Sequence, residues 1–394
     1  MNRIDYRTGP LAGITVLEVG GIGAVPVIGM LLADLGATVI RVDRPGDLAG
    51  LSDASQTFRD RRSIEIDLRS PDGVPLLLRL VERADVLLEA WRPGVAERLG
   101  IGPEVCLARN PMLVYGRMTG WGADGPLAHK GGHDINYISI TGALHAIGPA
   151  GEPPAVPLNL FGDYGGGAMM LVMGVLAALL ERRTSSRGQV VEAAMVDGTL
   201  ALLSEWQSWR DQGRWRDERE RNLIDGGAPF YRTYETSDGN YMAVGAIEPK
   251  FYSDLLAGLG VEKSLAATQM DEQTWPALRD RFAGIFRQRS QQEWEDTFAE
   301  LDACVTPVVS LADAPAHPHN AARGRFLNAD GHTFIAPPVR FSRTPAGIHA
   351  GPPERGEHTR EVLAALGLSD DEIDQFYDRG VLGARSGTGA IRPD

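Results

Sequence analysis

Three segments of the sequence contain the residue types that acid–base chemistry requires. Residues 131–137 read GGHDINY and include His133, and residues 159–167 read NLFGDYGGG and include Asp163. A further acid, Glu248, directly precedes a proline. Imidazole and carboxylate groups are the side chains that most often transfer protons in enzymes. The three segments therefore suit removal of a proton from a carbon atom next to a carbonyl group.

The same residues also have structural explanations. Most histidines are structural or solvated, but the glycines before His133 would let a ligand approach the backbone closely. Asp163 and Glu248 each stand where an acid could cap a helix, and Asp134 has the same ambiguity. Spacing alone does not choose among these acids.

Composition limits the class of protein. With 52 acidic and 39 basic residues the formal net charge is −13, which argues against a nucleic-acid partner. The two cysteines, Cys106 and Cys304, lie far apart, so the sequence encodes neither a disulfide framework nor a CxxC metal site. This pattern favours a reducing cytoplasm, and we expect no metal and no redox cofactor.

Two further features argue against export and membrane insertion. Charged residues at positions 3, 5 and 7 precede any apolar stretch, so no signal peptide is expected. The most apolar window, residues 168–180, is about thirteen residues long, which is too short for a membrane span of roughly 20. We therefore expect no membrane partner.

The first half of the chain alternates strand and helix patterns. Strands are expected at residues 14–19, 38–42, 63–68, 85–89 and 112–115. Helices are expected at residues 26–35, which Gly36 ends, and from residue 70, where a serine and a proline begin the helix. This alternation predicts an α/β fold with a mainly parallel sheet, in which ligands bind beyond the carboxyl ends of the strands.

The second half has a different pattern. Residues 230–235 and 241–244 flank the turn sequence SDGN, which predicts a β-hairpin. Helices are expected at residues 251–259, 275–287, 292–301, 357–366 and 370–377. This arrangement predicts a smaller α+β domain, and a chain of 394 residues has room for two domains.

The predicted domain boundaries follow from these patterns. We assign residues 1–200 to the first part of the large domain and residues 228–320 to the small domain. Residues 201–227 are expected to form a connecting helix or linker. They overlap a charged and tryptophan-containing stretch (196–221) that resembles one long helix. Residues 321–394 are expected to return to the large domain.

The first predicted strand–helix turn imitates a dinucleotide-binding motif. Gly21 and Gly23 follow a strand, and Asp43 follows the next one, but Pro26 stands where the motif has its third glycine. A nicotinamide site is therefore a weak prediction, and an ordinary glycine turn is the simpler one. An intermediate interpretation is that the turn holds a different nucleotide, with Arg44 near its phosphates.

Over nearly its whole length the chain resembles the family III CoA transferases, also called CaiB/BaiF proteins. The shared segments are residues 9–13, 35–45, 92–100, 117–122, 225–229 and 304–308. Within that family the chain is similar to the α-methylacyl-CoA racemase branch, which residues 131–137, Asp163 and residues 245–250 distinguish. The C-terminal residues from 384 onward do not match the family.

The resemblance implies a fold and an activity. The fold is a Rossmann-like large CoA-binding domain plus a smaller α+β domain, in an interlocked homodimer. The activity is interconversion of (2R)- and (2S)-2-methylacyl-CoA thioesters through an enolate, in fatty-acid or steroid side-chain degradation. His133 and Asp163 match the two bases on opposite faces of the substrate carbon, and Glu248 matches the partner of the histidine.

The resemblance also implies the residues that bind acyl-CoA, the expected substrate. They are Ile22, Arg44, Leu68, Arg98, Gly132, Asp134, Ile135, Asn136, Tyr137 and Asn159. The backbone N–H groups of residues 132–135 are our candidates for donors to the enolate oxygen.

Two other functions remain open at the level of sequence. In a CoA transferase, the aspartate that matches Asp163 is a nucleophile that forms an acyl anhydride, and no histidine partner is needed. An acyl-CoA-binding protein with a silent site is a non-enzymatic alternative. His133 and Glu248 favour the racemase.

Overall fold

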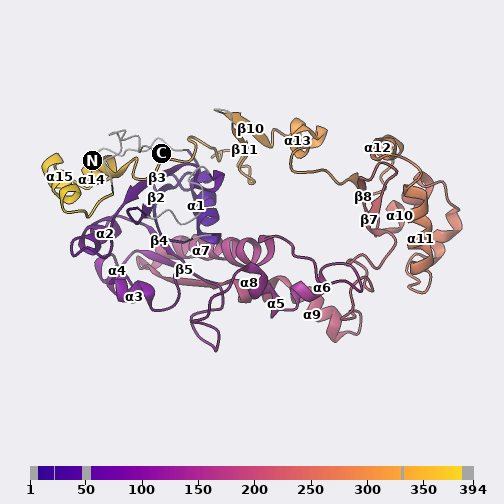
Figure 1. The fold of residues 1–394 in the computed structure, drawn as a ribbon, viewed down its shortest axis with the longest axis horizontal. Coiled ribbons are helices and arrows are strands. Elements are labelled where there is room, and N and C mark those ends of the chain that lie inside the picture. The colour runs from indigo at the N-terminus through magenta and orange to yellow at the C-terminus, as the bar shows by residue number, and fades with distance from the viewer. Residues whose placement is uncertain (1–7, 22, 47–54, 330–331, 384–394) are drawn as a thin grey trace, which may run out of the picture. The chain divides into compact units, whose positions relative to one another are not determined.

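The computed structural model describes residues 8–21, 23–46, 55–329 and 332–383 (Figure 1). The chain divides into two compact units. The first unit contains the residues up to Thr141, Leu158–Leu202 and the residues from Phe326 onward. The second unit contains Gly142–Pro157 and Leu203–Arg325. The chain therefore leaves the first unit twice and returns to it twice.

The first unit is built on a six-stranded sheet in which every neighbouring pair is parallel. The strand order is β3-β2-β1-β4-β5-β6. The strands are β1 (Thr15–Val19), β2 (Thr38–Asp43), β3 (Arg61–Glu65), β4 (Val86–Glu89), β5 (Val114–Thr119) and β6 (Gln189–Ala194). The parallel α/β sheet is thus confirmed, although the sequence did not predict β6. Strand order reverses between β1 and β4, the position where such sheets bind ligands.

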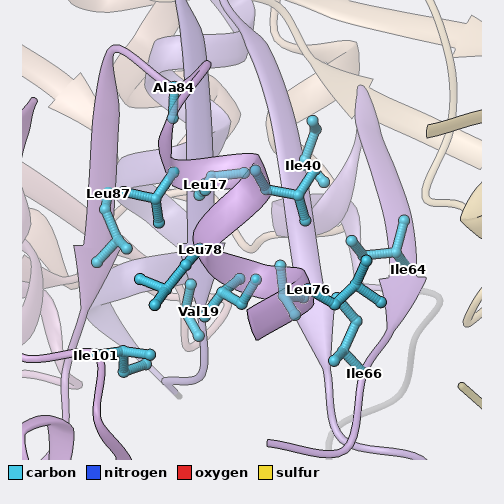
Figure 2. Packing of buried hydrophobic residues seen from close by; sticks show 14 of the residues in the cluster. Leu17, Val19, Ile40, Ile64, Ile66, Leu76, Leu78, Ala84, Leu87 and Ile101 are labelled. Atoms are coloured by element: carbon cyan, nitrogen blue, oxygen red, sulfur yellow. The ribbon is translucent and has the colours of Figure 1, made fainter. Parts of the chain in front are cut away.

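Helices cover both faces of this sheet. Leu17 of β1 packs with Leu76 of α2 (Gly73–Val81) on one face, as Figure 2 shows. The next residue toward the N-terminus, Val16, packs on the opposite face with α1 (Ala24–Asp34) and α7 (Met169–Ser185). Side chains alternate between faces along a strand, so a sheet buried on both sides requires continuous apolar strands.

Shorter elements complete the first unit. They are η1 (Gln56–Phe58), α3 (Val95–Leu99), α4 (Pro103–Arg109), α5 (Asp134–Ser139), η2 (Leu160–Ala168), α8 (Met195–Leu202), β10 (Phe326–Ala329), β11 (His332–Ile335), α14 (Thr359–Ala365) and α15 (Asp370–Asp378). The predicted C-terminal helices correspond to α14 and α15. Both contribute to the same core as α2 through Leu363 and Ile373.

The second unit has the expected hairpin and helices. Strands β7 (Tyr231–Glu235), β8 (Tyr241–Gly245) and β9 (Val305–Pro307) form an antiparallel sheet. Its helices are α6 (Ala143–Ala146), α9 (Ser204–Asp211), α10 (Pro249–Gly258), η3 (Lys263–Thr268), α11 (Trp275–Phe286), α12 (Gln291–Phe298), η4 (Ala314–Ala316) and α13 (Pro318–Ala322). An aromatic core joins the sheet to the helices, with Tyr234 stacked on Phe286 at 4.8 Å between ring centroids.

The prediction of one long helix over residues 196–221 is wrong. Helix α8 ends at Leu202 in the first unit, and α9 begins at Ser204 in the second. Helix α9 buries none of its residues, so no packing extends it. It ends where Gly213 takes a positive φ of 70° and Arg214 N–H donates back to the carbonyl of Trp209.

The apolar helix is longer than the sequence predicted. Because η2 continues directly into α7, Leu160–Ser185 forms 26 residues that are long and apolar enough, by length and composition, to cross a membrane. In the first unit α7 instead buries Leu171 and Val175 in the core, and its Arg182 pairs with Asp85 at 2.8 Å. A buried core helix has the same features.

Candidate active site

His133 is held at the start of α5 by its neighbours. It is the N-cap residue of that helix, and its backbone N–H donates to Oδ1 of Asn136 at 3.1 Å. Tyr137 donates its hydroxyl hydrogen to the carbonyl of Gly132, and its ring packs edge-on against Trp121 at 4.8 Å. These contacts fix the backbone, and the His133 side chain is left exposed.

Asp163 lies in the π-helix η2, which is pressed against α8. A β-carbon at Gly198 would lie 1.8 Å from the carbonyl oxygen of Gly166, so the two backbones touch and both residues must be glycine. The Nδ2 group of Asn159 donates to Oδ2 of Asp163 at 3.2 Å. π-Helical segments are rare and are frequently found at functional sites.

The turn between β1 and α1 also reaches Asp163. Gly23 caps α1 with a positive φ of 69°, and a β-carbon there would lie 2.9 Å from Oδ2 of Asp163. The glycines that imitated a dinucleotide motif thus include one that makes room for the aspartate. Ile22, a predicted substrate contact, lies outside the described residues.

The environment of Asp163 favours its protonated form. Burial is the largest cause that raises its pKa, and the charge of Asp134 raises it further, whereas Asn159 and His133 lower it. Burial and the charge of Asp163 likewise raise the pKa of Tyr137. A raised pKa makes a carboxyl group a better proton acceptor, which suits a residue that must both take up and release a proton.

His133 and Asp163 line one cavity of about 630 Å³. Other lining residues include Gly23, Trp91, Arg92, Met118, Trp121, Lys130, Gly132, Tyr137 and Met195. The cavity therefore presents an imidazole and a carboxyl group to the same space, with aromatic and methionine side chains around them. Among the predicted contacts it includes Gly132 and Tyr137. The sequence prediction missed Trp91, Arg92, Trp121 and Lys130, although three of these lie in or next to the family-like segments 92–100 and 117–122.

A second cavity, of about 350 Å³, lies at the carboxyl ends of β1 and β2. Its lining includes Asp43, Arg44, Leu68, Arg355 and Trp91, and Trp91 therefore borders both cavities. Arg44 is exposed there and suits a phosphate, because guanidinium groups bind phosphates through two parallel hydrogen bonds. The arrangement suits a long ligand with a nucleotide at one end.

A buried ion pair supports Trp91. Arg117 Nε donates to Glu89 Oε1 at 2.7 Å, and Glu89 Oε2 accepts the backbone N–H of Trp91 at 2.7 Å. Glu89 is 1% exposed. Because Glu89 ends β4 and Arg117 lies in the neighbouring strand β5, the sheet itself determines where Trp91 stands.

Several predicted residues lie outside both cavities. Arg98 is exposed on α3, whose Val95 and Leu99 do line the second cavity. Ile135 and Asn136 are exposed on α5. Asp134 is only 5% exposed, and its carboxylate binds the backbone of η2.

Glu248 belongs to the second unit, whereas His133 and Asp163 belong to the first. It occupies the N-cap position of α10, but its side chain makes no capping hydrogen bond and is exposed. The side chain of Glu248 therefore does not cap α10.

Comparison with known proteins assigns the family. Residues 11–359 match the model of CoA-transferase family III. The chain belongs to CoA-transferase family III. It is 45% identical to the α-methylacyl-CoA racemase of Mus musculus, over 93% of this chain and 96% of the mouse protein. It is 42% identical to that of Homo sapiens over the same shares.

A solved family III structure has the same fold. The chain resembles a CAIB/BAIF family protein from Brucella suis with a TM-score of 0.75 and 26% identity, covering 91% of this chain and 100% of the other. The family III match, residues 11–359, includes every residue that lines the two cavities described above.

Proposed function

We propose that the protein is an α-methylacyl-CoA racemase that interconverts (2R)- and (2S)-2-methylacyl-CoA thioesters. The observation that carries the proposal is one cavity lined by both His133 and Asp163. The identity of 45% to a racemase over 93% of the chain supports it. In this mechanism one residue removes the α-proton, and the other returns a proton to the opposite face of the carbon.

The thioester makes this chemistry possible. Its α-proton is far more acidic than that of a carboxylate, because no negative charge opposes formation of the enolate. A positioned acid or base contributes about 10² to 10⁴ in rate. The enolate oxygen needs donors, and the N–H of His133 already binds Asn136. The backbone N–H groups of Gly132, Asp134 and Ile135 therefore remain as our candidates.

The two cavities suggest how acyl-CoA is bound. The nucleotide end lies with Arg44 and Leu68, and the thioester lies between His133 and Asp163. Trp91, which borders both cavities, is placed to contact the chain that joins the two ends of the ligand. Apolar side chains such as Met118 and Met195 suit an alkyl group at the reacting carbon.

The proposal includes a homodimer in which Glu248 of one subunit approaches His133 of the other. Two observations support it. The side chain of Glu248 is exposed and makes no capping hydrogen bond, and Glu248 belongs to a different unit of the chain from His133. Co-expression of His133→Ala and Glu248→Ala chains with different tags tests it. Mixed dimers contain one intact site, so roughly a quarter of wild-type activity returns at random pairing. Recovery of no activity would contradict a shared site.

We also propose a cytoplasmic enzyme with no nucleic-acid or membrane partner. The net charge of −13 argues against a nucleic-acid partner, and the exposed thiol of Cys304 suits a reducing compartment. Fractionation of cells that produce the protein tests whether it lies in the cytoplasm and whether it binds membranes.

A CoA transferase would use Asp163 differently, and a trapping experiment separates the two functions. A transferase forms an acyl anhydride on the aspartate, which hydroxylamine captures. We expect acyl-CoA plus hydroxylamine to leave Asp163 unmodified and the enzyme active. A hydroxamate at Asp163, without interconversion of epimers, would assign the transferase activity instead.

A further inference from the structure

One carboxylate oxygen joins the two segments that carry the proposed bases. Asp134, the residue after His133, points its side chain toward η2. Its Oδ2 accepts the backbone N–H of Gly162 at 2.6 Å and that of Asp163 at 2.7 Å. The residues joined are 28 and 29 positions apart in the sequence.

The contact is closely fitted. A β-carbon at Gly162 would lie 2.8 Å from Oδ2 of Asp134, so a side chain there would push the carboxylate away from the backbone of η2. Asp134 is 5% exposed, and its other oxygen, Oδ1, has no hydrogen-bond partner among the described residues. Burying a carboxylate is costly when one oxygen stays unpaired. A neutral side chain could accept the same two N–H groups, so stability alone does not account for the charge.

We propose that Asp134 is a positioning residue, whose buried carboxylate fixes the backbone of Asp163 relative to His133 so that both reach the same substrate carbon. This inference rests on the proposed racemase function. It also reassigns the side chain of Asp134 from the substrate contacts expected from sequence to the support behind the two bases. Because small displacements of a reacting group strongly reduce rate, such a support affects turnover more than binding.

The charge of Asp134 gives the inference a second consequence. Three neighbouring groups shift the pKa of Asp163: Asp134 raises it, whereas Asn159 and His133 lower it. Arg92, Lys130 and Tyr137 line the same cavity. The first turn of α1 contains no acid, and the ionisable residue of α8, Asp197, is exposed. Asp134 raises the pKa of Asp163, so removal of its charge lowers that pKa.

Three variants test the role of Asp134. Asp134→Asn keeps an acceptor oxygen but loses the charge, Asp134→Ala loses both, and Asp197→Asn removes a nearby exposed charge as a control. Each is assayed for deuterium exchange into 2-methylacyl-CoA across pH, and for amide hydrogen exchange of the peptide covering residues 160–168. Circular dichroism reports folding.

The expected results separate position from charge. We expect Asp134→Ala to lower kcat about a hundredfold with little change in KM. The backbone amides of residues 160–168 are expected to exchange faster in this variant than in the wild-type enzyme. Asp134→Asn retains amide protection, and the acid limb of its kcat/KM profile moves to lower pH. Asp197→Asn matches wild type. If Asp134→Ala does not fold, the acid limb of the kcat/KM profile of Asp134→Asn tests the inference alone.

An unmoved acid limb in Asp134→Asn, or wild-type kcat in a folded Asp134→Ala, would overturn the inference. Absence of exchange in the wild-type enzyme would instead refute the racemase function. In that case the amide exchange of residues 160–168 still tests the contact itself.

Discussion

A β-carbon at Gly23 would lie 2.9 Å from Oδ2 of Asp163. The turn that follows the first strand therefore touches a proposed base that lies 140 positions later in the chain. Gly23 also has a positive φ of 69°, which residues other than glycine rarely adopt. The same glycine satisfies a backbone requirement and leaves space for the carboxylate.

Gly23→Ala separates these two roles. This sparsely populated backbone conformation costs about 1–3 kcal/mol in an alanine, and the new methyl group displaces the Asp163 side chain. We expect proton exchange to fall about a hundredfold. Gly13→Ala is the matched control, because Gly13 has a φ of 87° with nothing within 4 Å of its built β-carbon. Equal loss of activity in both variants would show that backbone strain, not contact with Asp163, is responsible.

Asn159→Ala tests the electrostatics of Asp163 in the opposite direction from Asp134→Asn. The hydrogen bond from Asn159 lowers the pKa of Asp163, so its removal raises that pKa. In a two-base mechanism the active free enzyme carries one proton between the two bases, and the acid limb of kcat/KM reports gain of the second. The acid limb in Asn159→Ala is therefore expected at higher pH. Movement to lower pH would contradict the assigned hydrogen bond.

His133→Ala is expected to abolish racemisation without unfolding the chain. The His133 side chain is exposed in the cavity, so little packing is lost. Thermal unfolding and exchange of the α-proton are measured on the same preparation. His129→Ala is the control, because His129 is exposed and does not line that cavity. Near wild-type racemisation by His133→Ala would remove His133 from the mechanism.

Arg44→Ala is expected to weaken CoA binding more than turnover. A hydrogen bond to a charged group contributes about 1.5–3 kcal/mol, so the dissociation constant for CoA rises at least about tenfold. The same change is expected for Arg98→Ala, on the family resemblance alone. Arg210→Ala, at an exposed position of the second unit, is the control. Titration calorimetry with CoA measures all three, and unchanged affinity in Arg44→Ala would contradict the nucleotide site.

The sequence predicted the sheet because buried parallel strands such as 14–19 are mostly apolar. Strand β6 escaped prediction because Gln189 and Val190 are exposed on an edge strand. The long helix was wrong because residues 204–211 bury nothing, which local propensity does not reveal.

The site was predictable in part. His133 and Asp163 stood out through their glycine neighbours and the family resemblance. The support by Asp134 could not be foreseen, since it joins residues 134 and 163 through backbone N–H groups that carry no sequence signature. The role of Gly23 depends likewise on a tertiary contact.

Deuterium incorporation into separate (2R)- and (2S)-2-methylacyl-CoA samples in D₂O tests the central claim most directly. We expect both epimers to gain deuterium at C2 and to converge on one mixture, near one to one when no other stereocentre biases it. A panel of acyl chains in the same assay identifies the preferred substrate. Retention of the starting configuration and of the α-proton in every acyl-CoA tested would contradict the assignment of His133 and Asp163 as a pair of bases.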